Sequence, residues 1–456
     1  MKKLVTLLLA AGMVFSAANG ASAVEMKVSG SWLTSFTFAD NLFNNNGLVD
    51  DAKGDGSFNA AQRIRINFDM VASESLSGRV QLQVANENVG PQYYTWGTSG
   101  VGGTGKTVTA RLAYLDWMVP TTDVLVRMGR QEVTTPSYTF GSPILDTPVD
   151  GVLVNAPVND MVGVTLGWLR ASATLNKWAV EHQPHSSVDL AYLAVDVAAD
   201  GFKVTPYGMV GFIGSNAADL DMLGSAASSE NVMAYWVGLG GELTMFDPFK
   251  FTADFLYSAN DADGYAKRAG WYAALGAEMK TSFATPFVKG WYASGDDDDA
   301  DGEGGRFLSV DGAAAFDASS IYYDAYGLLA ATPDVCSAAG TWGVQLGVKE
   351  VSFIEDLSHM LSVTYFQGTN HSRNISNATA IKDGAGYAGI KYDGPIGYMT
   401  TEDSAVSIDF LNSYKLYENL TANILLAYLI TDFDKNVWGQ DYDNIFRGTL
   451  NFTYAF

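Results

Sequence analysis

The chain ends in Leu450-Asn-Phe-Thr-Tyr-Ala-Phe456, and the alternation in this stretch decides the fold. Successive side chains of an extended strand point to opposite faces, so one face carries Leu450, Phe452, Tyr454 and Phe456. The other face carries Arg447, Thr449, Asn451 and Thr453. A strand with one wholly apolar face needs an apolar environment on that side only. A soluble sandwich supplies it, and so does a lipid bilayer around a barrel.

The same alternation recurs near the start of the chain. In 26–38, one face carries Met26, Val28, Trp32, Phe36 and Phe38. In 63–70, Ile64, Ile66, Phe68 and Met70 alternate with Arg63, Arg65, Asn67 and Asp69. Aromatic residues at apolar positions near strand ends are typical of transmembrane barrels, which carry aromatic girdles at both membrane interfaces.

The connections between the expected strands alternate in length. Short turns are expected at 73–77, 120–123, 157–160, 200–201, 246–249, 354–357 and 414–419. Long stretches rich in Gly, Asn, Asp and Ser lie between them, at 39–57, 89–107, 132–149, 172–187, 214–230, 295–339 and 369–402. Short periplasmic turns and long extracellular loops are typical of outer-membrane barrels.

Counting hairpins predicts an all-β, transmembrane antiparallel β-barrel of about 18 strands, with 16 as the alternative. Either size leaves a water-filled lumen. The expected strands 188–199 and 420–431 alternate poorly. Either they line a subunit interface, where the outer face packs on protein, or the spans are divided wrongly.

The first 23 residues resemble a cleaved signal peptide. Met1-Lys2-Lys3 is basic, 4–18 is apolar or small, and Ala21-Ser22-Ala23 is a small-x-small cleavage site. We therefore expect one β-barrel domain over 24–456, exported through the periplasm. The stretch after the signal contains no run of 18 apolar residues, which predicts no transmembrane helix.

The chain is strongly acidic, with a formal charge of −23 that becomes about −25 without Lys2 and Lys3. This balance argues against nucleic acid as a partner, because nucleic acid favours basic surfaces. It fits a surface that binds divalent cations, or simply soluble exposed loops. Cys336 is the single cysteine, so no disulfide forms within one chain.

Four features carry a family resemblance: the signal peptide, the opening Glu25-Met-Lys-Val-Ser-Gly-Ser-Trp32, the arginine-rich second strand and the terminal Phe456. Over essentially the whole chain they resemble the homotrimeric outer-membrane porins of sulfate-reducing, Desulfovibrio-type bacteria. The general diffusion porins are a more distant likeness. The resemblance implies a homotrimer in contact with outer-membrane lipid and lipopolysaccharide. It also implies passive diffusion of water, ions and small hydrophilic solutes, no enzymatic activity and no required cofactor.

In diffusion porins, a long third loop folds into the lumen and its acids face arginines on the wall. By this resemblance, the loop 132–149 forms a pore constriction with the acids Glu132, Asp146 and Asp150. The facing bases are Arg63, Arg65, Arg79, Arg111 and Arg127. The family's Pro-Glu-Phe-Gly-Gly signature is missing from the loop, which leaves the constricting acids open. Opposed charges across a narrow gap sort solutes by charge. The alternative is that the arginines form ordinary salt bridges that support the barrel.

An acidic run offers a calcium site. Asp297, Asp299 and Asp301 alternate and Gly302 follows, as in the first half of a Ca²⁺-binding loop. The bidentate Glu expected later is replaced by Leu308. A solvated acidic loop is the alternative.

Three other functions stay open beside the diffusion porin. A channel selective for sugars or organic acids would use aromatic residues such as Tyr93, Tyr94 and Trp96 along the lumen. A barrel hydrolase would need a Ser–His pair, but Ser358 and His359 are sequence neighbours and point to opposite strand faces. A surface adhesin would bind through the long loops. Separately, Gly238-Leu-Gly240-Gly241 lies inside an expected strand, where it marks a bend or close packing.

Overall fold

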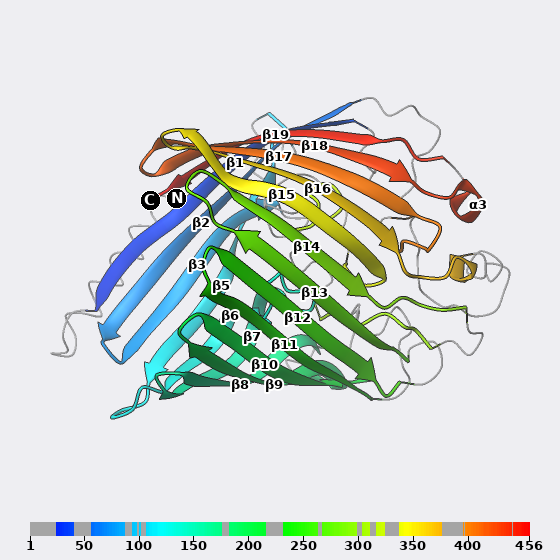
Figure 1. Ribbon diagram of the computed structural model, residues 1–456. Coiled ribbons are helices and arrows are strands. Elements are labelled where there is room, and N and C mark those ends of the chain that lie inside the picture. The colour runs from blue at the N-terminus through cyan, green and yellow to red at the C-terminus, as the bar shows by residue number, and fades with distance from the viewer. Residues whose placement is uncertain are drawn as a thin grey trace.

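The computed structural model describes residues 24–40, 56–86, 94–97, 100–101, 106–175, 182–215, 231–262, 267–298, 303–310, 316–323, 337–375, 395, 397–439 and 441–456. Nearly all regular structure is β (Figure 1). The strands are β1 (Glu25–Asp40), β2 (Ser57–Ser73), β3 (Leu76–Asn86), β4 (Tyr94–Thr95), β5 (Lys106–Met118), β6 (Leu125–Thr134), β7 (Asp146–Asn159), β8 (Val162–Leu175), β9 (His182–Ala199), β10 (Phe202–Ile213), β11 (Val232–Phe246), β12 (Phe249–Asn260), β13 (Ala269–Met279), β14 (Thr285–Ala293), β15 (Thr341–Ile354), β16 (Leu357–Gly368), β17 (Ser404–Tyr417), β18 (Leu420–Asp432) and β19 (Ile445–Ala455).

The sheet closes on itself. Each wall strand pairs antiparallel with its neighbours in the chain, and β1 pairs with both β2 and β19. The two-residue β4 only extends the wall beside the top of β2. Among the described residues, eighteen strands therefore form a closed antiparallel barrel, which confirms the larger of the two predicted strand numbers. Closure satisfies the edge hydrogen bonds that an open sheet would leave exposed.

The two ends of the barrel differ in the length of their connections. Short turns such as Asp200-Gly201 and Glu355-Asp356 lie at one end, where β1 begins and β19 ends; we call it the turn end. The longer connections lie at the opposite, loop end, where the short helix α3 (Lys435–Trp438) follows β18 (Figure 1). The predicted asymmetry of connections is confirmed.

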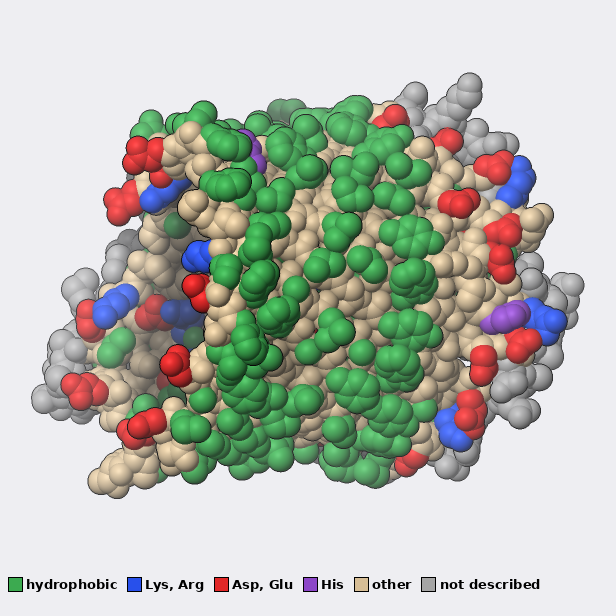
Figure 2. All heavy atoms as spheres, in the orientation of Figure 1, with side chains coloured by type: hydrophobic (Ala, Val, Ile, Leu, Met, Phe, Trp, Pro, Cys, Tyr) green, Lys and Arg blue, Asp and Glu red, His purple; other side chains and the backbone are tan. Residues whose placement is uncertain are grey.

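The outer face of the barrel is apolar. In β11, Tyr235, Val237 and Leu239 are exposed, whereas Trp236 between them is fully buried on the inner face. Figure 2 shows a broad band of hydrophobic side chains over this face of the barrel, with charged side chains gathered at its two ends. An apolar belt of this extent is unfavourable in water and matches the hydrocarbon core of a membrane. No helix in the described part of the chain is long and apolar enough to cross a membrane.

The inner face has two different halves. On β1 to β5 it is polar, with buried residues such as Thr37, Gln81 and Gln83. On β8 to β11 it is largely apolar, with fully buried residues such as Leu169, Leu190 and Trp236. On β12 to β16, apolar residues such as Phe366 share the inner face with buried polar ones such as Ser258. The same contrast explains the poor alternation of 188–199 and 420–431. Their buried residues are Val188, Leu190, Tyr192, Ala194, Leu425, Ala427 and Leu429, and all seven belong to one inner hydrophobic cluster. The poor alternation of these two strands is therefore explained by an inner face that packs on protein inside the barrel. The sequence had suggested instead an outer face that packs on another subunit.

Candidate channel constriction

A chain of hydrogen bonds crosses the polar half of the inner wall and ends at an ion pair. Asn67 on β2 donates to Ser29 on β1, and Gln81 on β3 donates to Asn67. Arg111 on β5 then donates to Gln81 at 3.1 Å. The same guanidinium lies 2.6 Å from a carboxylate oxygen of Glu132 on β6. The network fixes Arg111 where it bridges the polar wall and the β6–β7 hairpin.

Two more arginines lie beside this ion pair. Arg63 and Arg65 both lie on the inner face of β2, and Arg65 donates to Gln83 at 2.7 Å. The charge of Arg111 acts on both of them, and that of Glu132 acts on Arg65. The buried Nε of Arg63 has no hydrogen-bond partner among the described residues. The structure thus brings together Arg63, Arg65, Arg111 and Glu132, which we call the arginine cluster.

Arg79 and Arg127 lie apart from the arginine cluster. Each is 2.6 Å from an acid on a neighbouring strand, Arg79 from Asp69 and Arg127 from Asp116. Arg127 also lies 4.2 Å above the Tyr114 ring. Both pairs stand on strand segments close to the turn end. Arg79 and Arg127 therefore form salt bridges within the wall, because each has an acid as its neighbour on the same inner face. This is the alternative that the sequence left open for the predicted constriction arginines.

The connection between β6 and β7 crosses the inside of the barrel. Residues 135–145, the first inward segment, lie against the inner face of β10 to β12. The backbone N–H groups of Tyr138 and Thr139 donate to the two carboxylate oxygens of Asp254 on β12, at 2.8 and 2.7 Å. The Tyr138 hydroxyl lies 2.7 Å from that of Thr205 on β10. Asp254 therefore anchors the tip of the segment on the wall.

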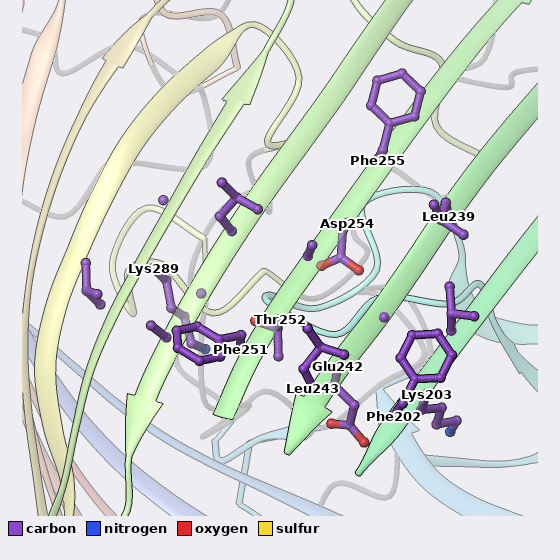
Figure 3. A pocket seen from close by; sticks show the side chains of 18 of the residues that line it. Phe202, Lys203, Leu239, Glu242, Leu243, Phe251, Thr252, Asp254, Phe255 and Lys289 are labelled. Atoms are coloured by element: carbon purple, nitrogen blue, oxygen red, sulfur yellow. The ribbon is translucent and has the colours of Figure 1, made fainter. Parts of the chain in front are cut away.

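Glycines in the wall leave room for the tip of this segment. A Cβ at Gly240 would lie 2.7 Å from the Tyr138 ring, and one at Gly276 would lie 2.5 Å from the Thr252 hydroxyl. The predicted close packing at Gly238 to Gly241 is confirmed by these distances. On the opposite, outer face, the same strands leave an apolar groove of about 780 Å³ lined by residues such as Phe251 and Phe255 (Figure 3). The groove belongs to the apolar belt.

A second inward segment comes from the connection between β14 and β15. Its described parts are 303–310 and 316–323. Ser320 donates through its N–H and its hydroxyl to Asp409 on β17, and Arg447 on β19 donates to the Ser320 carbonyl. Gln345 on β15 donates to the carbonyl of Asp317 at 3.0 Å. Asp409 and Arg447 are completely buried, so this segment is packed tightly on the inner wall.

The two inward segments contact each other inside the barrel. The rings of Phe140 and Phe316 stack with their centroids 4.7 Å apart. Val310 donates a backbone hydrogen bond to Ile144 at 2.9 Å. Both segments thus pack into one apolar mass on the β8 to β17 side, opposite the polar wall that carries the arginine cluster.

The three predicted acids have different positions. Glu132 and Asp146 lie on the strand arms of the β6–β7 hairpin, where Thr134 donates to Asp146 at 2.6 Å. Asp150 is a direct cross-strand partner of Arg170, which shares a face with exposed Trp168. Direct partners project from the same face. The assignment of Asp150 to the constriction is therefore wrong, because its side chain is on the outside of the wall.

The aromatic residues predicted for the lumen lie elsewhere, and the predicted calcium site falls partly outside the described residues. Tyr94 pairs with Gln62, which accepts a hydrogen bond from the exposed outer Trp32, and Trp96 packs on Phe36. These rings lie on the outer face, so they do not form an aromatic track in the lumen; Tyr93 lies outside the described residues. Asp299 and Asp301 also lie outside them, and the described residues hold no group of three potential metal ligands. Calcium binding stays a prediction.

Sequence reasoning missed Asp254 and the whole second inward segment. The signal for both was the apolar inner face of β8 to β11 and the buried aromatic residues further along the wall, such as Trp291 and Phe366. An inner face that met only water would be polar, so its apolar character requires protein inside the barrel. Asp254 stands between buried Thr252 and Leu256 on the inner face of β12, and a buried acid at such a position marks an anchor.

No protein-family model and no curated protein matches this chain. Solved structures do match. OccK9 (OpdG) of Pseudomonas aeruginosa aligns with a TM-score of 0.55 and 12% identity over 94% of this chain and 98% of its own. OpdO of the same organism gives 0.54 and 11% over 95% and 97%. OpdQ gives 0.52 and 11% over 94% and 97%. At this identity the likeness shows the fold alone, a closed antiparallel barrel of eighteen strands.

Proposed function

We propose that the protein is an outer-membrane porin that gives passive diffusion to water, ions and small hydrophilic solutes. The observation that carries the proposal is the combination of an apolar outer belt with a charged, hydrogen-bonded inner wall in a closed barrel. A lumen that holds arginines and carboxylates must hold water, since unsolvated charges would be costly there. Export through the periplasm and insertion beside lipopolysaccharide belong to the same proposal.

The arginine cluster forms the constriction in this proposal. It stands where the β6–β7 hairpin approaches the polar wall, and it carries three cations against one carboxylate. Fixed charges within about 10 Å of a passing ion decide its energy, because salt screens the more distant acidic loops. We therefore expect the channel to prefer anions, although the chain as a whole is acidic.

The test is the reversal potential of the folded protein in a planar bilayer under a KCl gradient. The unaltered channel is expected to prefer Cl⁻. The variant Arg63→Gln with Arg65→Gln is expected to lose this preference, because two of the three cations are gone. Arg373→Gln is the matched control, since Arg373 is exposed at the loop end and pairs with Asp298. A folded protein without conductance would refute the porin, and an unchanged reversal potential would refute the constriction.

The same cluster favours a second candidate, a channel selective for organic acids. Arginine binds carboxylates through two parallel hydrogen bonds, and the arginine cluster holds three guanidinium groups against one carboxylate. Selectivity of this kind would appear as a block of Cl⁻ current by small carboxylates at millimolar concentration. A hydrolase has less support, since His359 contacts Asn412 at 2.6 Å and stacks on Phe410. Homotrimer formation and calcium at the 297–301 loop remain further proposals from the sequence.

A further inference from the structure

Four charged residues form one continuous row across strands β6 to β9. In the sheet register, Arg130 faces Asp150, Asp150 faces Arg170, and Arg170 faces Asp189. The guanidinium of Arg130 lies 3.3 Å from Asp150, and that of Arg170 lies 2.9 Å from Asp189. Ser187 and Trp168 also donate to Asp189. We call Arg130, Asp150, Arg170 and Asp189 the outer rung.

The outer rung lies on the outside of the barrel. Trp168, two residues before Arg170, is 47% exposed, whereas Leu169 between them is fully buried on the inner face. The row continues in register into apolar residues at both ends, Ala113 on β5 and Phe212 on β10. Phe212 is half exposed, as expected of the apolar belt. The outer rung thus interrupts a row that is otherwise apolar.

On the loop-end side of the outer rung, the β6–β7 hairpin leaves the wall of the barrel. The pairing of β5 with β6 ends at Ala113 and Arg130, and that of β7 with β8 ends at Asp150 and Arg170. Beyond these pairs, the β6–β7 hairpin leads into the inward segment. Within the described residues, the loop-end parts of β5 and β8 therefore have no strand partner on the side where β6 and β7 leave the wall. The outer rung borders this opening in the wall on the side of the turn end.

Charges on a lipid-facing strand are costly, and more so the deeper they lie. Two occupants would relieve that cost, an anionic headgroup or protein. Each arginine of the rung already has a carboxylate partner, and the row has no net charge, so it offers little attraction to an anion. A row that alternates Arg, Asp, Arg and Asp is complementary to another copy of itself.

We propose that the outer rung and the opening above it form the docking surface for a second copy of this chain. The proposal rests on the membrane insertion of the proposed function. It assigns the subunit contact to the outer wall of β6 to β9, beside the strands that carry the constriction. Self-association then covers the rung and shields its charges from lipid.

The first test removes the charges at constant size, with Arg130→Gln, Asp150→Asn, Arg170→Gln and Asp189→Asn in one variant. The control is Arg127→Gln with Asp116→Asn, which removes a 2.6 Å ion pair from the inner face of β5 and β6. The mass of the full-length protein is measured in mild detergent by native mass spectrometry. We expect the unaltered chain and the control to be oligomers, and the rung variant to dissociate at protein concentrations at least tenfold higher.

The second test uses cross-linking in native membranes, with Cys336→Ser as background. Val152→Cys places a thiol on the outer face next to the rung, and Leu153→Cys places one on the inner face. A bis-maleimide is expected to join two copies through position 152 but not through position 153. An unaltered chain that is monomeric, or a rung variant of unaltered mass, would overturn the proposal. Loss of bound lipopolysaccharide with no change in subunit number would also overturn it and assign the rung to a headgroup. Conductance is measured separately, so that failure of the proposed porin function can be distinguished from failure of the proposed docking surface.

Discussion

The side chain of Glu132 combines two effects that can be separated by substitution. Its carboxylate holds Arg111 at 2.6 Å, and its charge offsets part of the positive field of the arginine cluster. Gln keeps the shape and one acceptor oxygen but removes the charge. We expect Glu132→Gln to raise the anion-to-cation permeability ratio by roughly twofold to fivefold. The measurement is again the reversal potential. An unchanged reversal potential would show that Glu132 does not face the conducting path.

Asp296 illustrates how one buried carboxyl depends on its neighbours. Burial acts to raise the pKa of Asp296, but the charges of Arg306 and Arg268, together with hydrogen bonds from Arg306 and Tyr398, lower the pKa below its usual value. Arg306 donates to it through its backbone N–H and its guanidinium, and the Tyr398 hydroxyl donates at 3.1 Å. A carboxyl with a lowered folded-state pKa stabilises the protein fully above its unfolded pKa, about 3.9, and this contribution is lost as the pH falls through the lower, folded value.

We therefore expect Asp296→Asn to lower the Tm by several degrees at pH 7 and by progressively less below about pH 4. Thermal unfolding followed by circular dichroism over this range checks the prediction. Asp298→Asn is the control, because the pair of Asp298 with Arg373 is exposed and should contribute little. A Tm difference that stays constant into strong acid would contradict the role given to the charge.

At the scale of elements, one carboxylate makes several of the polar contacts that hold the tip of the first inward segment. The Asp254 carboxylate accepts from two backbone N–H groups of the segment and from the Ser137 hydroxyl. Hydrogen bonds to a charged group contribute about 1.5–3 kcal/mol each, so Asp254→Asn should weaken the attachment markedly. The rest of the segment stays packed on its apolar side through Phe140 and Ile144.

We expect Asp254→Asn to leave the barrel folded but to make its conductance noisy, with frequent steps between two levels as the tip detaches. Glu242→Gln is the matched control, because Glu242 lies on the inner face of neighbouring β11 and pairs with Lys250. Single-channel recordings of both variants decide the matter. A quiet Asp254→Asn channel with unaltered conductance would mean that apolar packing alone holds the segment.

For the whole molecule, the joint between β1 and β19 is the step that closes the barrel. Gly30 and Phe456 exchange backbone hydrogen bonds at 2.8 and 3.1 Å. A Cβ at Gly30 would lie 2.5 Å from the Arg65 carbonyl oxygen and 2.6 Å from the Phe456 ring. At Gly448, also on β19, the nearest atom is at an ordinary 3.6 Å. The two glycines thus differ in how much room a side chain would have.

We expect Gly30→Val to reduce the yield of folded barrel severely and Gly448→Ala to have a small effect. Folded and unfolded barrels are separated by their migration on unheated gels. Equal yields for the two variants would show that the end of the chain tolerates displacement and that closure does not depend on this contact.

Sequence patterns predicted the wall of this molecule well and its contents poorly. Period-two alternation is a local property, so strand existence, strand number and the turn asymmetry could be predicted from residues close in the chain. The contact of Tyr138 with Asp254 or of Ser320 with Asp409 joins residues about a hundred positions apart. No local pattern encodes such pairs. Asp150 was misassigned for the same reason, because its face depends on where the hairpin leaves the wall.

The lopsided filling of the barrel has a consequence for transport. An eighteen-strand circumference suggests a wide conduit, and strand number is often used to estimate pore width. In the described part of the chain two segments occupy the β8 to β17 side, so the solute route of the proposed porin runs off-centre along β1 to β6. A molecule moving along that route has a polar, arginine-bearing surface on one flank and a packed aromatic mass on the other. Its orientation therefore matters as much as its diameter, and elongated solutes with one charged edge should pass more easily than compact ones of equal volume.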